Sequence, residues 1–189
     1  AVAIRFGGGE PTLRKNLVHI LTREIEKRFK KNGVKVSIVL ITNGVLLGRD
    51  WIEFVKKHKI RLCISLDGVE EWHDRTRSLR SGQGTFRKVW DGIKHCQDAG
   101  LEPTILTTIT EENLEGIEEL NSLLVDLNLK FRYGVYRNVD GDRRLHEKFI
   151  HKLSIVLHAC YDYYAEAIRA GRAVFKHQLA DIRIDTNRH

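Results

Sequence analysis

The sequence predicts an α/β fold built on a parallel sheet, because short β-type runs alternate with longer amphipathic runs. The starts of the expected strands are separated by 32, 26, 43 and 27 residues, close to the ~30 residues of a βαβ unit. This rhythm predicts right-handed helical crossovers, and it is compatible with an open doubly wound sheet or with a barrel. The expected strands are Val2–Phe6, Val34–Ile41, Ile60–Leu66, Pro103–Ile109 and Lys130–Tyr136.

Amphipathic helices are expected between these strands. In the first, apolar residues such as Leu13, Leu17 and Ile20 recur at spacings of three and four, and the Asn32–Gly33 pair is expected to end it. The connection from Val69 to Gly84 is overlong and is expected to be a loop. The remaining helices are expected around Trp51–Val55, Phe86–Ile93 and Leu114–Leu127, with a long last helix from Leu145 to Ala170.

Composition bounds the class of protein. The chain has 189 residues, 42% of them apolar, which suits one compact domain. The 32 Lys and Arg against 25 Asp and Glu are interleaved along the chain, so a nucleic acid partner is not expected. Cys63, Cys96 and Cys160 are odd in number and far apart in the sequence, which argues against a disulfide framework and against a short-spaced metal knuckle. A reducing cytoplasm is expected. A membrane span and a signal peptide are not expected either.

The N-terminus begins inside an apolar run, with no turn or capping residue before Ala1. The sequence also contains no methionine. Both features lead us to expect an internal fragment of a longer protein.

Polar and small residues follow each expected strand. The carboxyl ends of parallel strands meet on one face, where ligands of α/β proteins bind, so these residues are expected to line one site. The strand ends read Gly7-Gly8-Gly9-Glu10-Pro11, Thr42-Asn43-Gly44, Ser65-Leu66-Asp67-Gly68, Thr107-Thr108-Ile109-Thr110 and Tyr133 to Asn138.

The run from Gly7 to Pro11 carries the clearest chemistry. Three glycines remove every Cβ at the strand end, which lets a ligand reach the backbone. Pro11 fits the first turn of a helix, and Glu10 at that junction suits a ligand ammonium. The alternative is a glycine turn with a capping glutamate near the helix dipole. A phosphate loop is disfavoured, because the Lys-Ser/Thr pair is absent and an acid stands where an anion would bind.

The ordered set FGGGEP, ITNG, SLDG, HDRTR and GQGTFRKVWDGI resembles the radical S-adenosylmethionine (SAM) superfamily, in particular peptide- and protein-modifying maturases such as anaerobic sulfatase maturases. The resemblance covers Val2 to about Tyr136. It implies a partial (β/α)6 TIM-like barrel of parallel strands, in which the five strands here are the second to sixth. The first strand and its CxxxCxxC loop, which binds a 4Fe–4S cluster in the family, are lacking from this sequence.

The resemblance assigns Gly8, Gly9 and Glu10 to the cradle for the methionine ammonium of SAM, in agreement with the interpretation from the residues alone. Thr42 and Asn43 line the same rim. A simple turn at Asn43–Gly44 is the alternative.

The same resemblance makes Ser65 a hydroxyl contact to the cofactor and places Asp67 in the cofactor-binding set, where Asp67–Gly68 as a plain turn is the alternative. In some members of the family an arginine at the position of Arg5 faces the substrate, so the resemblance assigns Arg5 to the substrate. His73, Asp74 and Arg77 either order the long loop by charge pairing or touch cofactor or substrate, and ordering is the favoured interpretation. In all, seven residues are assigned to cofactor binding: Gly8, Gly9, Glu10, Thr42, Asn43, Ser65 and Asp67. No catalytic residue and no metal ligand is assigned.

The resemblance implies an enzyme that uses SAM and a 4Fe–4S cluster to form a 5′-deoxyadenosyl radical and modify a peptide or protein. It also implies an electron donor such as a flavodoxin or ferredoxin. The cluster ligands are missing, so the 189-residue chain alone is expected to be inactive. The expected organisation is a partial barrel over residues 1–140, then a C-terminal helix and tail over 141–189 that lead toward a missing region.

Two other classes stay open. One is another α/β barrel enzyme that acts on a sugar or phosphate substrate with Asp67 and His73 as acid and base. The other is a cluster-free binding domain that keeps the pocket.

Overall fold

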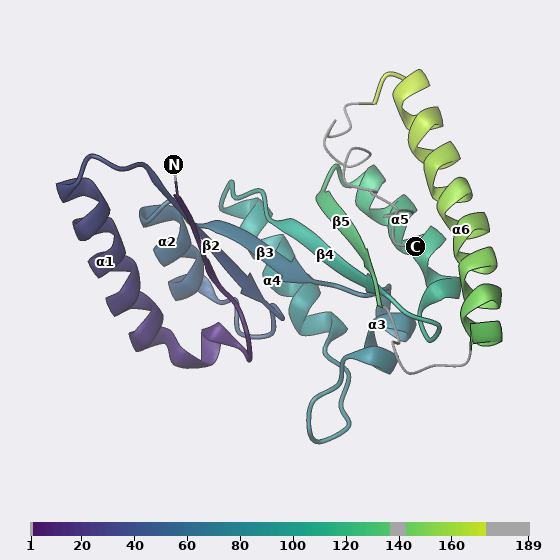
Figure 1. The fold of residues 1–189 in the computed structure, drawn as a ribbon, viewed down its shortest axis with the longest axis horizontal. Coiled ribbons are helices and arrows are strands. Elements are labelled where there is room, and N and C mark those ends of the chain that lie inside the picture. Colours follow the sequence, from purple (N-terminus) through teal and green to yellow (C-terminus); the bar gives the residue numbers. More distant parts are fainter. Residues whose placement is uncertain (1, 137–142, 173–189) are drawn as a thin grey trace. The chain divides into compact units, whose positions relative to one another are not determined.

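The computed structural model describes residues 2–136 and 143–172, without the side chains of 143–146. Its strands form a five-stranded parallel sheet with the order β1–β2–β3–β4–β5, which confirms the predicted α/β class (Figure 1). The strands are β1 (Val2–Phe6), β2 (Val36–Thr42), β3 (Arg61–Ser65), β4 (Thr104–Ile109) and β5 (Lys130–Val135). Each lies within one or two residues of its predicted bounds.

Helices connect the strands in the predicted alternation. They are the 3-10 helix η1 (Pro11–Arg14), α1 (Lys15–Lys31), α2 (Arg49–Lys57), α3 (Glu70–Thr76), α4 (Phe86–Asp98), the 3-10 helix η2 (Leu114–Gly116), α5 (Ile117–Asp126) and α6 (Arg143–Arg169). The first helical segment ends as predicted: Asn32 caps α1, and Gly33 has a φ of 65°, a conformation that favours glycine.

The expectation of a loop from Val69 to Gly84 is wrong, because this connection contains the helix α3. Glu70 and Glu71 lie in its first turn, where carboxylates interact favourably with the helix dipole. After α3 the chain turns back on itself, and Ser78 forms an antiparallel bridge with Gly84. The connection is therefore ordered by its own helix and turn.

The chain divides into two compact units, which are described separately. The first consists of residues 1–66 and 85–104. The face of its sheet that carries Leu40, Leu62 and Ile64 is buried, and α4 packs there through Val89. This unit carries 17 Lys and Arg against 8 Asp and Glu, so it holds the whole positive excess of the chain.

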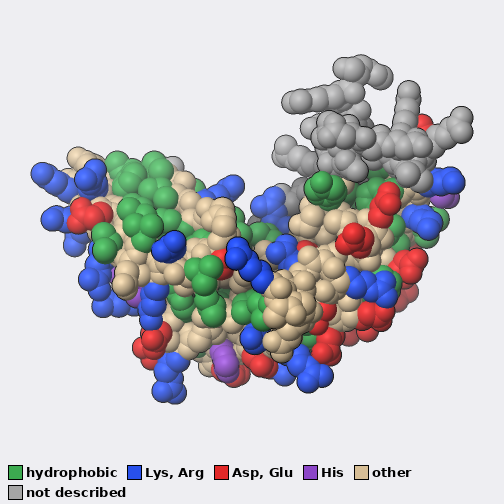
Figure 2. All heavy atoms as spheres, turned by 90° about the horizontal axis from the view of Figure 1, so that it is seen from below, with side chains coloured by type: hydrophobic (Ala, Val, Ile, Leu, Met, Phe, Trp, Pro, Cys, Tyr) green, Lys and Arg blue, Asp and Glu red, His purple; other side chains and the backbone are tan. Residues whose placement is uncertain are grey.

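The helical segment formed by η1 and α1 leaves an apolar stripe uncovered in the first unit. Leu13, Leu17 and Ile20 are 69%, 53% and 60% exposed. Figure 2 shows hydrophobic side chains gathered with Lys and Arg side chains at the left, over α1. Among the described residues, no helix is both long and apolar enough to cross a membrane.

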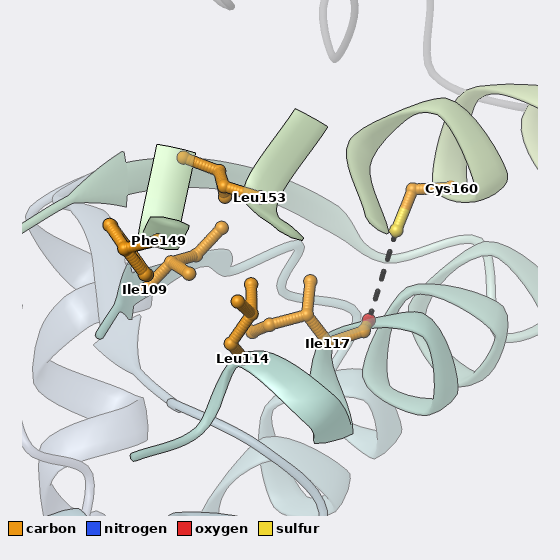
Figure 3. Packing of buried hydrophobic residues seen from close by; sticks show 6 residues of the cluster. All are labelled: Ile109, Leu114, Ile117, Phe149, Leu153 and Cys160. Carbon is orange, nitrogen blue, oxygen red and sulfur yellow. Dashed lines mark hydrogen bonds between the residues drawn. The ribbon is translucent and has the colours of Figure 1, made fainter. Parts of the chain in front are cut away.

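The second unit consists of residues 67–84 and 105–189. Its apolar core joins β4, η2, α5 and α6 (Figure 3), and the thiol of Cys160 approaches the carbonyl of Ile117 at 4.0 Å. The core residues are Ile109, Leu114, Ile117, Phe149, Leu153 and Cys160. The domain boundary expected near residue 140 and the tail after residue 172 lie outside the described residues, so both stay predictions.

Candidate functional site

Two glycines in left-handed conformation follow β1. Gly8 has a φ of 85° and Gly9 a φ of 55°, a region that side chains with a Cβ seldom adopt. A Cβ at either position would meet no atom within 4 Å. The glycines are therefore required by the backbone turn, and they leave open space beside their peptide groups, as the sequence predicted.

The carboxylate of Glu10 is the centre of a hydrogen-bond cluster. Its Oε1 accepts from the Thr12 amide (3.0 Å), the Thr12 hydroxyl (2.6 Å) and the Thr42 hydroxyl (2.7 Å). Its Oε2 accepts from the Asn43 amide at 2.7 Å. Glu10 thus caps η1 and at the same time ties the end of β1 to the end of β2.

The turn after β2 is built around the same cluster. The Thr42 hydroxyl accepts from the Gly44 amide (3.1 Å), and the Asn43 side chain accepts from the Val45 amide (3.0 Å). Gly44 has a φ of 79°, and a Cβ there would lie 2.8 Å from Ile64 Cγ2. The turn at Asn43–Gly44, the alternative interpretation from the sequence, is present, and the structure brings this turn together with Glu10. Contacts of Thr42 and Asn43 with the cofactor stay predictions.

Chemically, this corner offers acceptors to a cation. Oε2 of Glu10 accepts one hydrogen bond from the described residues, and a carboxylate oxygen has two lone pairs. The corner therefore has both negative charge and backbone groups freed of Cβ atoms. The helix-capping interpretation of Glu10 is confirmed, and its contact with an ammonium stays a prediction that is compatible with this geometry.

Ser65 and Arg5 lie on the strands of the first unit. Ser65 is the last residue of β3 and is half-buried, and Arg5 is an exposed residue of β1. Their contacts with cofactor and substrate stay predictions.

The backbone amide, the carbonyl and the carboxylate of Asp67 all form hydrogen bonds with residues of the second unit. Its carboxylate accepts from the Thr108 amide (2.8 Å) and from the Arg77 guanidinium. Its amide donates to His73 Nδ1 (3.2 Å), and its carbonyl accepts from the Asn113 side chain (2.7 Å). Asp67 and Arg77 therefore brace this region by charge pairing, as favoured from the sequence for Arg77. A contact of Asp67 with the cofactor stays a prediction.

His73 is fully buried on α3. Burial lowers the pKa of His73 from its ordinary 6.5 to about 4, against the opposing effect of Asp67; Arg77 lowers it further and Asp74 raises it. Because Nδ1 accepts the Asp67 amide, the proton of the neutral ring is on Nε2. At neutral pH the His73 ring is therefore neutral, and its Nδ1 holds the start of this connection through the Asp67 amide.

Sequence reasoning missed two residues of these clusters. Thr12, 4% exposed, supplies two of the four donors to Glu10; its place two residues after the capping glutamate is the available signal. Asn113, fully buried, links Asp67 to the backbone of Thr108 and Thr110. No sequence pattern points to Asn113, because its side chain joins two segments that are far apart in the chain, the turn at Asp67 and the end of β4.

The three cysteines lie on different elements. Cys63 is half-buried in β3, whereas Cys96 on α4 and Cys160 on α6 are buried. Burial raises the pKa of the Cys96 thiol to about 11 and that of Cys160 to about 12. Among the described residues, no group of three or more His, Cys, Asp or Glu side chains is arranged to hold a metal ion.

Comparison with known proteins gives the family. The family model described as "Radical SAM superfamily" matches residues 1–124. A cysteine-type anaerobic sulfatase-maturating enzyme of Clostridium novyi (strain NT) is 29% identical over 126 residues, which are 67% of this chain and 34% of that protein. A GTP 3′,8-cyclase of Peptoclostridium acidaminophilum is 36% identical over 132 residues, 69% of this chain and 38% of that protein. The chain thus spans about a third of these relatives.

Solved structures share the fold. The structure titled "Native anSMEcpe with bound AdoMet" superposes with a TM-score of 0.77 at 22% identity and covers 93% of this chain and 50% of that one. Streptococcus suis SuiB bound to S-adenosylmethionine gives a TM-score of 0.56 at 21% identity, over 80% of this chain and 36% of that one. Because the family model covers well over half of the residues and starts at the β1 strand that leads into the glycine corner, this chain belongs to the radical SAM superfamily.

Proposed function

We propose that this chain is the SAM-binding part of a longer radical SAM enzyme that modifies a peptide or protein. The observation that carries the proposal is the corner after β1, where Gly8 and Gly9 are both left-handed and a Cβ would meet no atom within 4 Å. The Glu10 carboxylate next to this space supplies the charge that an ammonium needs.

The described residues fit the methionine end of SAM. The ligand ammonium requires acceptors in a space free of Cβ atoms, and the corner of Gly8, Gly9 and Glu10 provides both. Thr42 and Asn43 fix the direction of the carboxylate, so that it is oriented before a ligand arrives. Ser65 at the end of β3 is the proposed hydroxyl contact.

The described residues do not fit a 4Fe–4S cluster, because Cys63, Cys96 and Cys160 are held in a strand and in two different helices. We propose that the cluster ligands belong to another part of the longer protein. When it is bound, SAM together with a reduced cluster supplies the 5′-deoxyadenosyl radical on which the family's chemistry depends. The part played by this chain is to bind and orient the ligand and to exclude water.

A peptide or protein substrate is favoured by the relatives named anaerobic sulfatase-maturating enzymes. Other relatives are named GTP 3′,8-cyclase and Fe-coproporphyrin III synthase, names that do not refer to a peptide or protein substrate. The substrate class is therefore tested directly. We also propose that a flavodoxin or ferredoxin donates the electron. The proposed location of the protein is the cytoplasm. The radical SAM family match replaces the alternative of an unrelated sugar- or phosphate-specific barrel.

The function is tested on the longer protein, purified and reconstituted without oxygen. We expect SAM cleavage to 5′-deoxyadenosine, measured by chromatography, to be stimulated by a peptide fraction and not by nucleotides. Gly9→Ala should reduce this product, and Gly33→Ala, which changes an equally left-handed glycine at the end of α1, should not.

Two results would contradict the proposal. Stimulation by a nucleotide in place of peptides would overturn the substrate class. Failure to bind SAM, with the fold intact by circular dichroism, would overturn the SAM site, whereas SAM binding without any cleavage would favour the cluster-free binding domain.

A further inference from the structure

One face of the β1–β2–β3 sheet is covered by helices, and Ile64 shows which face this is. A Cβ at Gly44 would lie 2.8 Å from Ile64 Cγ2 and 3.1 Å from Val89 Cγ1, so the Ile64 side chain points toward α4. Side chains alternate along a strand. Arg61 and Cys63 therefore point to the opposite face of the sheet.

The register of the strands places a second arginine beside Arg61. Arg5 of β1 pairs with Val39 of β2, and Val39 pairs with Arg61 of β3. Partners in a parallel ladder project from the same face, so the three side chains form one row, here called the Arg5–Val39–Arg61 row. Two strand spacings separate the arginine Cα atoms by roughly 10 Å, a distance over which two long side chains can meet on one small ligand.

The row carries two positive charges, and no ion pair with Asp or Glu neutralises them among the described residues. Arg5 and Arg61 are both exposed, and within residues 2–136 and 143–172 neither forms an ion pair. Other arginines of the chain do: Arg75 pairs with Glu71, and Arg77 with Asp67. Val39 between the two is only 7% exposed, which gives the row an apolar floor that strengthens electrostatic attraction above it.

We propose that the Arg5–Val39–Arg61 row binds an oxyanion of the substrate, a carboxylate or a phosphate. Arginine is suited to this task, because its planar guanidinium donates two parallel hydrogen bonds to such groups. One member of the row, Arg5, lies on the strand that leads into the glycine corner, three residues before Gly8. The inference rests on the proposed function and narrows it: the substrate is acidic at the part that enters this face.

The row is tested by nuclear magnetic resonance on the 189-residue chain, with the Nε–Hε signals of the arginines as the direct readout. Glutarate and inorganic phosphate are titrated separately, which distinguishes carboxylate from phosphate. We expect the Arg5 and Arg61 signals to move together along one saturation curve for at least one anion. Arg5→Gln and Arg61→Gln should each weaken binding about tenfold, and Arg5→Lys should weaken it less.

Arg23→Gln is the matched control, because Arg23 is an exposed residue of α1 and its loss removes the same charge. If Arg23→Gln weakens anion binding as much as Arg61→Gln does, the attraction is due to net charge and the proposal is overturned. Static Arg5 and Arg61 signals in the unmodified chain overturn it as well, whatever the folding of the variants.

A parallel titration with SAM separates this inference from the proposed function. Anion shifts at Arg5 and Arg61 without SAM shifts at Gly8 to Glu10 would uphold the row and contradict the SAM site. SAM shifts without anion shifts would overturn the row alone.

Discussion

The Thr42 hydroxyl donates a 2.7 Å hydrogen bond to the Glu10 carboxylate, although the two residues are 32 positions apart in the chain. This bond joins the ends of two neighbouring parallel strands at the point where each enters its turn. Glu10 is therefore a structural residue and a candidate ligand at once, and substitutions there affect both properties.

The first prediction concerns the stability that Glu10 provides. In Glu10→Gln one carboxylate oxygen becomes an NH2 group, which cannot accept the hydrogen bonds of its donors. We expect a loss of about 1.5–3 kcal/mol in the free energy of unfolding, as for hydrogen bonds to charged groups. Urea unfolding measures this, with Thr42→Val as the comparison: it removes one donor, keeps the charge and should cost about 1 kcal/mol. Equal stability of Glu10→Gln and the parent would show that the negative charge of Glu10 and the hydrogen bond lost with one oxygen contribute nothing.

The second prediction ranks three glycines by chemical denaturation. Gly9→Ala and Gly33→Ala both force a side chain into a left-handed conformation with free space around the Cβ, so each should cost about 1–2 kcal/mol. Gly44→Ala adds a contact at 2.8 Å with the buried Ile64 and should cost more. If Gly44→Ala is the least destabilising of the three, the turn does not pack closely against Ile64 of β3.

The third prediction is a pH dependence due to His73. Burial lowers the pKa of His73 to about 4 in the folded chain, compared with 6.5 when it is unfolded. Between these values the unfolded chain binds more protons, so stability is lost as the pH falls from about 6.5 toward 4, at up to about 1.4 kcal/mol per pH unit. In His73→Gln this component should disappear. Urea unfolding of both proteins at pH 5 and pH 7 measures the difference, and identical pH dependence would rule out a buried neutral His73.

The fourth prediction compares two carboxylate–arginine pairs of the second unit. Asp67 is buried and also holds the Thr108 amide, so Asp67→Asn should destabilise the chain by about 2–4 kcal/mol. Glu71 and Arg75 are both more than a third exposed, so Glu71→Gln should change stability by less than about 1 kcal/mol. Thermal unfolding gives both values. If Asp67→Asn leaves the stability unchanged, the hydrogen bonds and the ion pair of Asp67 do not stabilise this unit.

The strands and helices were predictable because each has a clear periodicity and a clear end. The pattern of Leu13, Leu17 and Ile20, followed by Asn32–Gly33, identifies a helix and its last turn without any tertiary information. The helix α3 was missed because seven residues with one buried side chain, His73, are too few to show an apolar stripe.

The site was predictable in part. Glycines and an acid at the end of β1 indicated the corner, since local backbone geometry dictates both. The partners of Glu10 and the bracing contacts of Asn113 depend on the exact register of neighbouring strands and on the geometry of the turns after them, which periodicity does not determine. The Arg5–Val39–Arg61 row likewise becomes visible only through the register of three strands.

The most direct test of the SAM site is a titration of the isotopically labelled 189-residue chain with SAM, followed by the backbone amide signals. We expect saturable shifts at Gly8, Gly9, Glu10 and Asn43, weaker shifts with an analogue that lacks the amino group, and little response in Gly9→Ala, while Gly33→Ala responds like the parent. If these amides do not move, or if the analogue without the amino group binds as well as SAM, the corner after β1 does not recognise the ammonium and the account is wrong.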